Sequence, residues 1–287
     1  MNKEIFAGKN IIVQGITGTH GAFHTARMRA SGTNIVAGTS PNKAGTHVDT
    51  VPVHATIKDI QVDFTVDASV IFVQAAFVKA AIIEAVNANV PLIICITEGV
   101  PIHDMLYIKR YMAGKSSVLI GPNSPGILIP GLHTLGIIPA SMGLAGTTGV
   151  VSRSGTLTYE LTAGLSRRGI GQRYVIGIGG DPIRGTNFTE CLQLFENDPA
   201  VTQIVMIGEI GGTDEILAAD YIKQHITKPV YGYIAGHAAP AGVQLGHAGA
   251  ILGSDQESAQ AKTERLREAG VTMSTSVTKL IDSVELL

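Results

Sequence analysis

Short, continuously apolar runs alternate with helical patterns through the first half of the chain. Each run is bounded by Gly, Pro or Asn, and the runs cover residues 11–13, 34–37, 70–73, 92–95 and 118–120. Strands that are apolar on both faces are typical of a parallel sheet covered by helices on both sides. Between two of these runs apolar residues recur at helical spacing, namely Phe77, Ala81, Ile82, Ala85 and Val86. The pattern therefore predicts a doubly wound α/β domain.

A second alternation follows a stretch that is dense in chain-breaking residues. Pro and Gly recur through residues 121–131, which predicts a domain junction and then an irregular connector to about Gly146. New apolar runs cover residues 150–151, 174–176, 204–207 and 230–234. Asn187 and Glu190 form a predicted capping pair at the start of one helix, whose inner face would carry Phe188, Leu192 and Phe195. The chain is expected to form a Rossmann-like domain (1–125) and a flavodoxin-like domain (145–287).

The composition narrows the class of protein. A chain of 287 residues is long enough for two domains, and its 15% of charged residues leaves much surface to be buried, inside or against partners. A net charge of -2 argues against a nucleic-acid-binding surface. Cys95 and Cys191 lie in apolar runs, as buried thiols in a reducing compartment would. Without a signal-peptide pattern or a span of about 20 apolar residues, a cytoplasmic location with no membrane contact is expected.

The first strand ends in a glycine-rich turn. Gly15, Gly18 and Gly21 follow the spacing G-x-x-G-x-x-G, which differs from the dinucleotide fingerprint G-x-G-x-x-G. Glycines at such a turn let backbone amides approach an anion at the start of a helix. The second strand ends in residues 39–43, with Lys43 and no acidic residue to hold a ribose. This favours a phosphorylated adenine-type cofactor over NAD, the alternative being a tight turn with a solvated lysine.

A further polar segment follows the strand at residues 92–95. Ile96, Thr97 and Glu98 would lie beyond its carboxyl end, in the same cleft as the turn after the first strand. A simple turn between strand and helix is the alternative.

Three features of the second half suit phosphoryl chemistry. Ser154 and Gly155 open a helix after an apolar strand, where free amides make either an anion seat or an ordinary N-cap. Glu209 follows another strand and could orient a histidine. His247 lies among Gly and Ala, and an imidazole of ordinary pKa could attack phosphorus. The histidines show no metal-ligand spacing, and no phosphate-binding loop G-x-x-x-x-G-K-[ST] occurs, so a nucleotide would bind to a partner.

Taken in order, the glycine-punctuated runs resemble the alpha subunit of succinyl-CoA synthetase (succinate–CoA ligase). The runs that carry the resemblance cover residues 152–160, 177–182, 205–212 and 246–251. The resemblance extends over nearly the whole chain and implies a ligase with His247 as the phosphorylated histidine and Glu209 as the carboxylate that steadies it. It also implies that Ser154 and Gly155 begin a helix facing the phosphohistidine and that Tyr159 lies near the carboxylic substrate. The coenzyme A site implied by the resemblance comprises Thr17, Gly18, Thr19, His20, Lys43, Ile96, Thr97 and Glu98.

The family mechanism implies a three-step relay. A nucleoside triphosphate phosphorylates the histidine, succinate accepts the phosphoryl group, and the thiol of coenzyme A attacks the acyl phosphate. The implied partner is a beta subunit with an ATP-grasp fold that binds Mg-ATP or Mg-GTP, in an alpha-beta or alpha2-beta2 assembly. The alternatives are a malate–CoA ligase or related acyl-CoA synthetase subunit, and a non-catalytic, regulatory CoA-binding paralogue.

Two departures from the family pattern bear on these alternatives. Ser124 stands where the family usually has cysteine, and residues 252–259 replace a run that commonly reads Gly-Gly-Lys-Gly-Thr-Ala. The second departure motivates the non-catalytic alternative, whereas His247 and Glu209 argue against it. The choices between ATP and GTP, between acids and between assemblies stay open.

Overall fold

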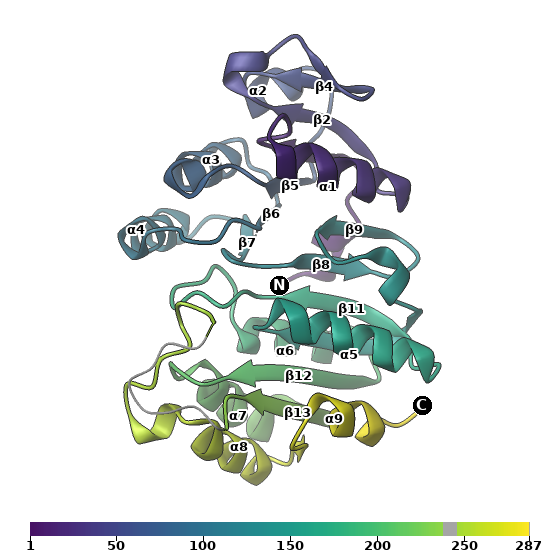
Figure 1. The fold of residues 1–287 in the computed structure, drawn as a ribbon, viewed down its shortest axis with the longest axis vertical. Coiled ribbons are helices and arrows are strands. Elements are labelled where there is room, and N and C mark those ends of the chain that lie inside the picture. The colour runs from purple at the N-terminus through teal and green to yellow at the C-terminus, as the bar shows by residue number, and fades with distance from the viewer. Residues whose placement is uncertain (238–245, 287) are drawn as a thin grey trace.

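The computed structural model describes residues 1–237 and 246–286, which form two α/β layers stacked along the long axis of the molecule (Figure 1). The first sheet has the order β3-β4-β2-β1-β5-β6-β7. Its strands are β1 (Ile11–Gln14), β2 (Ile35–Thr39), β3 (His47–Val48), β4 (Val51–His54), β5 (Ala68–Ile71), β6 (Leu92–Cys95) and β7 (Val118–Ile120). Its helices are α1 (Thr19–Ala30), α2 (Ile57–Ile60), α3 (Ala75–Asn87) and α4 (Ile102–Met112), with short 3-10 turns η1 (Lys3–Phe6) and η2 (Pro41–Lys43).

This sheet is parallel except for the pair β3–β4. Without β3 the order is that of a Rossmann fold, and it reverses between β1 and β5. The predicted Rossmann-like domain is confirmed. At the point of reversal the loops after β1 and β5 diverge, which leaves a crevice at the carboxyl ends of the strands.

The second sheet has the order β14-β13-β12-β10-β11-β8-β9. Its strands are β8 (Gly126–Ile129), β9 (His133–Gly136), β10 (Ala145–Ser152), β11 (Gln172–Gly177), β12 (Gln203–Glu209), β13 (Val230–Ala235) and β14 (Thr272–Met273). Its helices are α5 (Gly155–Arg167), α6 (Phe188–Asn197), α7 (Asp214–His225), α8 (Ala259–Glu268) and α9 (Val277–Ser283), with 3-10 turns η3 (Ala140–Met142) and η4 (Asp255–Glu257). The order of β10 to β14 is flavodoxin-like and reverses between β10 and β12, which confirms the second predicted fold.

The irregular connector predicted up to about Gly146 is wrong over part of its length. Residues 126–136 form the antiparallel strands β8 and β9, which extend the second sheet beyond β11. All residues of the two strands are buried, and Gly136 N donates to Met28 Sδ of α1 at 3.3 Å. The Pro and Gly residues therefore punctuate two short strands, whose polar backbone is satisfied by sheet pairing.

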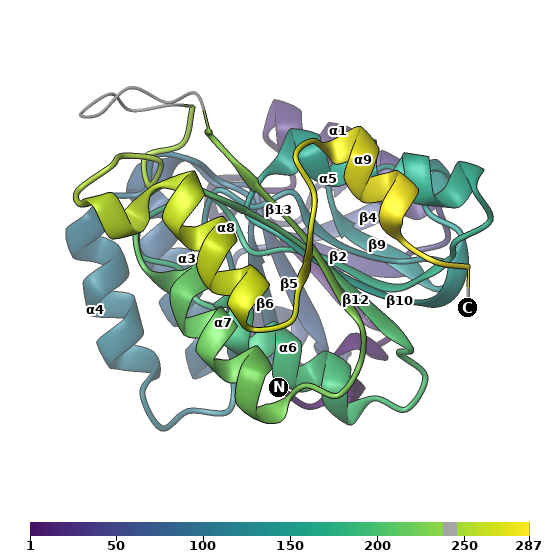
Figure 2. The same cartoon turned by 90° about the horizontal axis from the view of Figure 1, so that it is seen from below.

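The helices cover both faces of the sheets. Figure 2 shows α1, α5 and α9 on one side and α3, α4, α6, α7 and α8 on the other. The capping box predicted at Asn187 and Glu190 is present. The buried face of α6 carries Phe188, Leu192 and Phe195, which are fully buried.

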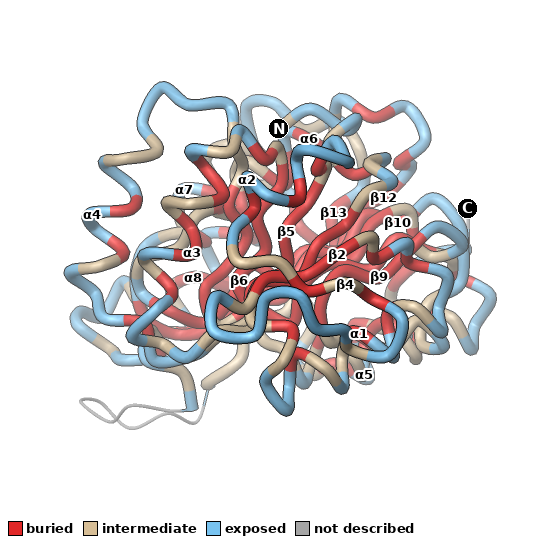
Figure 3. Tube along the Cα trace, turned by 90° about the horizontal axis from the view of Figure 1, so that it is seen from above, coloured by how far each residue is buried: buried red, intermediate tan, exposed pale blue. Residues whose placement is uncertain are grey.

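The two sheets share part of their core. One cluster of buried side chains joins Val13 of β1 to Ile127 of β8 and Tyr174 of β11, and Figure 3 shows burial concentrated along the strands. Phe6 in the N-terminal turn lies with its ring centroid 5.7 Å from that of Tyr174. Because this core is continuous, we expect the loops at the carboxyl ends of both sheets to keep a fixed relative position. Among the described residues no helix is long and apolar enough to cross a membrane.

Candidate active site

The glycine-rich turn after β1 brings the start of α1 close to the strand. A Cβ added to Gly21 would lie 2.2 Å from the carbonyl oxygen of Gly15, so only glycine permits this approach. Gly18 is the N-cap of α1 and provides no side-chain cap, which leaves the first helix amides available to an anion. Thr17 Oγ1 donates to Ser40 Oγ at 2.8 Å, so the turn after β1 contacts the loop after β2.

A cavity of about 410 Å³ lies at the point where the order of the first sheet reverses. Its lining includes four of the predicted site residues, His20, Ile96, Thr97 and Glu98. The lining also includes His24 and Phe72, whose rings stack with centroids 5.5 Å apart. Burial, and then the neighbouring His20, lower the pKa of His24, which favours the neutral form of this imidazole. Sequence reasoning missed His24, although its position four residues after His20 places both on one face of a helix.

A second cavity of about 530 Å³ adjoins the first, because Val73 lines both. It extends to the loop after β2, where Ser40, Pro41 and Asn42 line it. The four remaining predicted residues of this region line neither cavity: Thr17 is half-buried, and Gly18, Thr19 and Lys43 are exposed on the flanking segments.

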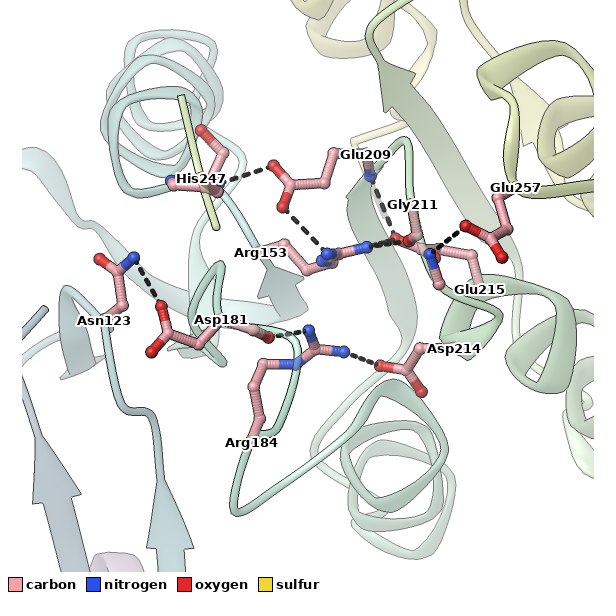
Figure 4. Close-up of polar contacts among 12 residues, drawn as sticks. Asn123, Arg153, Asp181, Arg184, Glu209, Gly211, Asp214, Glu215, His247 and Glu257 are labelled. Atoms are coloured by element: carbon pink, nitrogen blue, oxygen red, sulfur yellow. Dashed lines mark hydrogen bonds and ion pairs between the residues drawn. The ribbon is translucent and has the colours of Figure 1, made fainter. Parts of the chain in front are cut away.

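His247 contacts Glu209, as the sequence predicts. His247 Nδ1 lies 2.7 Å from Glu209 Oε2, and Figure 4 shows Glu209 between His247 and Arg153. Arg153 Nη2 lies 3.1 Å from the other carboxylate oxygen, Oε1. Arg153 and Glu209 follow the adjacent strands β10 and β12, between which the order of the second sheet reverses.

The hydrogen bond to Glu209 raises the pKa of His247, against the opposing effect of burial. The ordinary pKa assumed from the sequence is therefore wrong, because the carboxylate favours the imidazolium. With Glu209 ionised, Nδ1 carries a proton and donates it, and Nε2 is the nitrogen left for chemistry.

The glycine runs of the second domain enclose residues 246–251, which we call the histidine loop. A Cβ on Gly180 would lie 2.2 Å from His247 Cγ, and Gly249 N donates to the carbonyl of Gly180 at 3.0 Å. Glu257, within the divergent segment 252–259, accepts from Gly212 N at 3.1 Å and from Gly253 N at 3.0 Å. The divergent segment is thus tied to the turn after β12 by its own contacts.

One short segment links the first cavity to the histidine. Asn123 N donates to the carbonyl of Thr97 at 2.9 Å, and its Nδ2 donates to Asp181 Oδ1 at 3.0 Å. The negative charge of Glu98, which lines the cavity, also contributes to the raised pKa of His247. The cavity of the first domain and the histidine of the second therefore belong to one region of the molecule.

The start of α5 forms a capped helix as predicted, but no hydrogen bond joins it to His247 in the described part of the chain. Ser154 is the N-cap and accepts from Leu157 N at 3.3 Å, so its hydroxyl serves the helix. The amides of Gly155 and Thr156 have no partner within the helix, as at any helix start. Tyr159 is half-buried, and burial raises the pKa of its hydroxyl. Within the described ranges, 1–237 and 246–286, no hydrogen bond or ion pair joins His247 to Ser154, Gly155 or Tyr159.

No group of three or more His, Cys, Asp or Glu side chains within the described ranges could hold a metal ion. Sequence reasoning had not assigned four buried polar residues that form hydrogen bonds or ion pairs with Glu209 or Asn123, namely Arg153, Asp181, Glu215 and Lys262. Only Arg153 gave a sequence signal, as a cation between two serines at a strand end.

Comparison with protein families identifies the two domains. Residues 7–99 match the model described as CoA binding domain, and residues 151–272 match that described as CoA-ligase. Together with the two cavities and the histidine site, these matches define a subunit of a CoA ligase.

Similar proteins of known name narrow the class of CoA ligase to which this subunit belongs. The chain is 44% identical over 276 residues to the succinate–CoA ligase (ADP-forming) subunit alpha of Aquifex aeolicus, covering 96% of this chain and 90% of the relative. It is 48% identical over 260 residues to subunit alpha 2 of the same ligase from Archaeoglobus fulgidus, covering 91% and 90%. The chain belongs to the family of succinate–CoA ligase alpha subunits.

A solved structure has the same fold. ATP citrate lyase from Methanothrix soehngenii, in complex with citrate and coenzyme A, superposes with a TM-score of 0.82 at 27% sequence identity. The match covers 96% of this chain and 49% of the lyase chain.

Proposed function

We propose that this subunit forms succinyl-CoA from succinate and coenzyme A through a phosphohistidine at His247. The contact between His247 Nδ1 and Glu209 Oε2 at 2.7 Å carries this proposal. It holds the proton on Nδ1, so the lone pair of Nε2 can attack the terminal phosphorus of a nucleoside triphosphate while the bond to the diphosphate breaks. The imidazole then bears positive charge, which the carboxylate of Glu209 stabilises.

The following steps need an anion seat and a thiol. A carboxylate oxygen of succinate attacks phosphorus and releases neutral His247, and the sulfur of coenzyme A then attacks the acyl carbon and expels phosphate. The free amides of Gly155 and Thr156 at the start of α5 suit the phosphoryl oxygens. Tyr159, whose hydroxyl stays protonated because its pKa is raised, suits the neighbourhood of the acid.

Coenzyme A would occupy the two adjoining cavities of the first domain. The uncapped start of α1 and Lys43 suit its phosphates, and the apolar wall of Phe72 and Val73 suits its pantetheine arm. The hydrogen bonds from Asn123 to the carbonyl of Thr97 and to Asp181 join this cavity to the second domain, which supports a path from thiol to histidine.

The nucleotide would come from a partner. The chain has no nucleotide-binding loop motif, and its family name denotes the alpha subunit of a ligase. We assign Mg-ATP or Mg-GTP to a beta subunit with an ATP-grasp fold, in an alpha-beta or alpha2-beta2 assembly. Free buried thiols at Cys95 and Cys191 fit a cytoplasmic location.

The decisive experiment is phosphorylation of the complex with its beta subunit by γ-labelled ATP or GTP. One acid-labile phosphoryl group on His247, discharged by succinate with coenzyme A, is expected. His247→Asn should abolish it, whereas His237→Asn, an exposed histidine that precedes the same loop, should retain it. Labelling of another residue in His247→Asn would refute the proposal.

The same complex separates the alternatives. Discharge by malate rather than succinate would favour the malate–CoA ligase. Coenzyme A binding without any phosphohistidine would favour the non-catalytic paralogue.

The cofactor site has its own test. Lys43→Ala should weaken coenzyme A binding by about 1–2 kcal/mol, as for a charge-assisted contact. Lys58→Ala, which removes an exposed lysine of α2, is the matched control. Equal affinities for the two variants would place the phosphates elsewhere.

A further inference from the structure

A buried ion network adjoins Glu209, the residue that contacts His247. Arg153 is 2% exposed and Glu215 and Lys262 are fully buried. Arg153 Nη1 donates to Glu215 Oε1 at 2.9 Å and to the carbonyl of Gly211 at 3.0 Å. Lys262 Nζ donates to Glu215 Oε2 and, at 2.8 Å each, to the carbonyls of Glu209 and Gly211.

The network converges on one residue of the proposed relay, Glu209. Arg153 Nη2 lies 3.1 Å from Oε1 of Glu209, and Glu209 N donates to Glu215 Oε1 at 3.1 Å. Both the side chain and the backbone of Glu209 are therefore held by buried groups. Figure 4 shows the guanidinium of Arg153 lying between Glu209 and the Gly211 turn.

The charges in this network balance. Arg153 and Lys262 are two cations, and Glu209 and Glu215 are two carboxylates. A buried charge is tolerated only when it is paired and hydrogen-bonded, so removal of one member affects the positions of the others. Arg153 is therefore neither a solvated surface charge nor a free anion-binding group, because it is buried and paired with two carboxylates.

We propose that Arg153 is a positioning residue for the phosphoryl transfer, which holds the Oε1 side of Glu209 so that Oε2 faces Nδ1 of His247. This inference rests on the proposed function of His247. The carboxylate is shared between the guanidinium of Arg153, with which it forms an ion pair, and the ring of His247. Its orientation towards the histidine depends on the fixed position of that guanidinium. Glu215 and Lys262 in turn fix Arg153.

The same arrangement predicts a pH signature. Three charged groups influence the pKa of His247: Glu209 and Glu98 raise it, and Arg153 lowers it. His247 in turn lowers the pKa of Asp181, against the effect of burial. Without Arg153, the negative charge of Glu209 is no longer shared with the guanidinium and interacts with the imidazole alone. The pKa of His247 should then rise further, and less of the neutral, nucleophilic form should be present at pH 7.

The test compares charge-balanced variants in the complex with the beta subunit. Arg153→Gln/Glu215→Gln removes one cation and one anion from the network. Arg184→Gln/Asp214→Asn is the matched control, because this largely buried pair is joined at 2.8 Å. Its further hydrogen bonds join it to the carbonyl of Asp181 and the amide of Phe188 rather than to Glu209 or His247. Initial rates of His247 phosphorylation are measured per folded complex across pH 6–9, together with coenzyme A binding.

We expect the double variant Arg153→Gln/Glu215→Gln to be phosphorylated at least about tenfold more slowly at pH 7, as for loss of a partner that orients a functional histidine. Its pH profile should shift to higher pH, with coenzyme A binding unchanged. Arg153→Lys keeps the charge but loses the forked geometry, so it should restore the profile more than the rate. It also supplies the comparison should the double variant fail to fold.

A wild-type rate and profile in the Arg153 variants would overturn the inference. So would an equal shift in the Arg184 control, since the effect would then belong to folding at large. Absence of phosphohistidine in the wild-type complex would instead overturn the proposed function on which this inference depends.

Discussion

Replacing Glu209 by Gln isolates what its charge does for His247. The amide has nearly the shape of the carboxylate and can still accept a hydrogen bond from Nδ1, so the 2.7 Å contact can survive while the charge is lost. The hydrogen bond to Glu209 is the largest cause of the raised pKa of His247. The pKa should therefore fall in Glu209→Gln, and a larger fraction of the histidine should be neutral at pH 7.

The rate should nevertheless decrease. A hydrogen bond to a charged group contributes about 1.5–3 kcal/mol and a neutral one about 1 kcal/mol, so the phosphorylated, cationic imidazole loses roughly 0.5–2 kcal/mol of stabilisation. This corresponds to a decrease of roughly 2- to 30-fold in the rate of phosphorylation at a pH high enough for His247 to be neutral in both proteins. The decrease should be smaller at acid pH, because the lowered pKa of His247 keeps more of the imidazole neutral there.

Two measurements check this reasoning. An NMR titration of the His247 ring gives its pKa, and rapid quenching of the complex with labelled nucleotide gives the rate. Glu264→Gln, a change of an exposed carboxylate on α8, should alter neither. The reasoning fails if Glu209→Gln leaves the pKa of His247 unchanged. It also fails if the variant is phosphorylated faster than the wild type at a pH high enough for His247 to be neutral in both proteins.

Three further predictions concern sterics, polar burial and charge. Gly180→Ala should block phosphorylation but not coenzyme A binding, since its Cβ would lie 2.2 Å from His247 Cγ; normal labelling would contradict this. Ser124→Ala should lower the free energy of unfolding by about 1–3 kcal/mol in urea titrations, because the buried hydroxyl accepts from Gly126 N at 2.9 Å, and Ser124→Cys should cost less. Asp198 has its pKa lowered to about 2 from 3.8, because hydrogen bonds and nearby cations outweigh its burial. Its stabilisation of about 2 kcal/mol is therefore present above pH 4 and lost as pH falls towards 2, and Asp198→Asn should flatten this part of the stability profile.

Local signals in the sequence were enough for the fold and for the pair at the centre of the site. Apolar runs bounded by Gly and Pro mark strands because both faces of a parallel strand are buried, and such runs correspond to β1, β5, β6, β10 and β12. His247 and Glu209 could be paired because each lies in a glycine-rich segment and because the family motif names both. The strands β8 and β9 escaped prediction, since β8 pairs with a strand about 50 residues later and β9 pairs with β8. This pairing satisfies a backbone that its Pro and Gly content had marked as irregular.

Only the tertiary structure decided how the site is held. Lys262 lies on a helix that the sequence marks as polar, yet its ammonium is fully buried because the carbonyls of Glu209 and Gly211 and the carboxylate of Glu215 converge on it. The raised pKa of His247 likewise depends on groups that are 38 to about 150 residues away in the chain. Sequence periodicity reports which face of an element is apolar, whereas long-range polar contacts arise from the order of strands in the sheets. That order places the ends of β10 and β12 side by side, and with them Arg153 and Glu209.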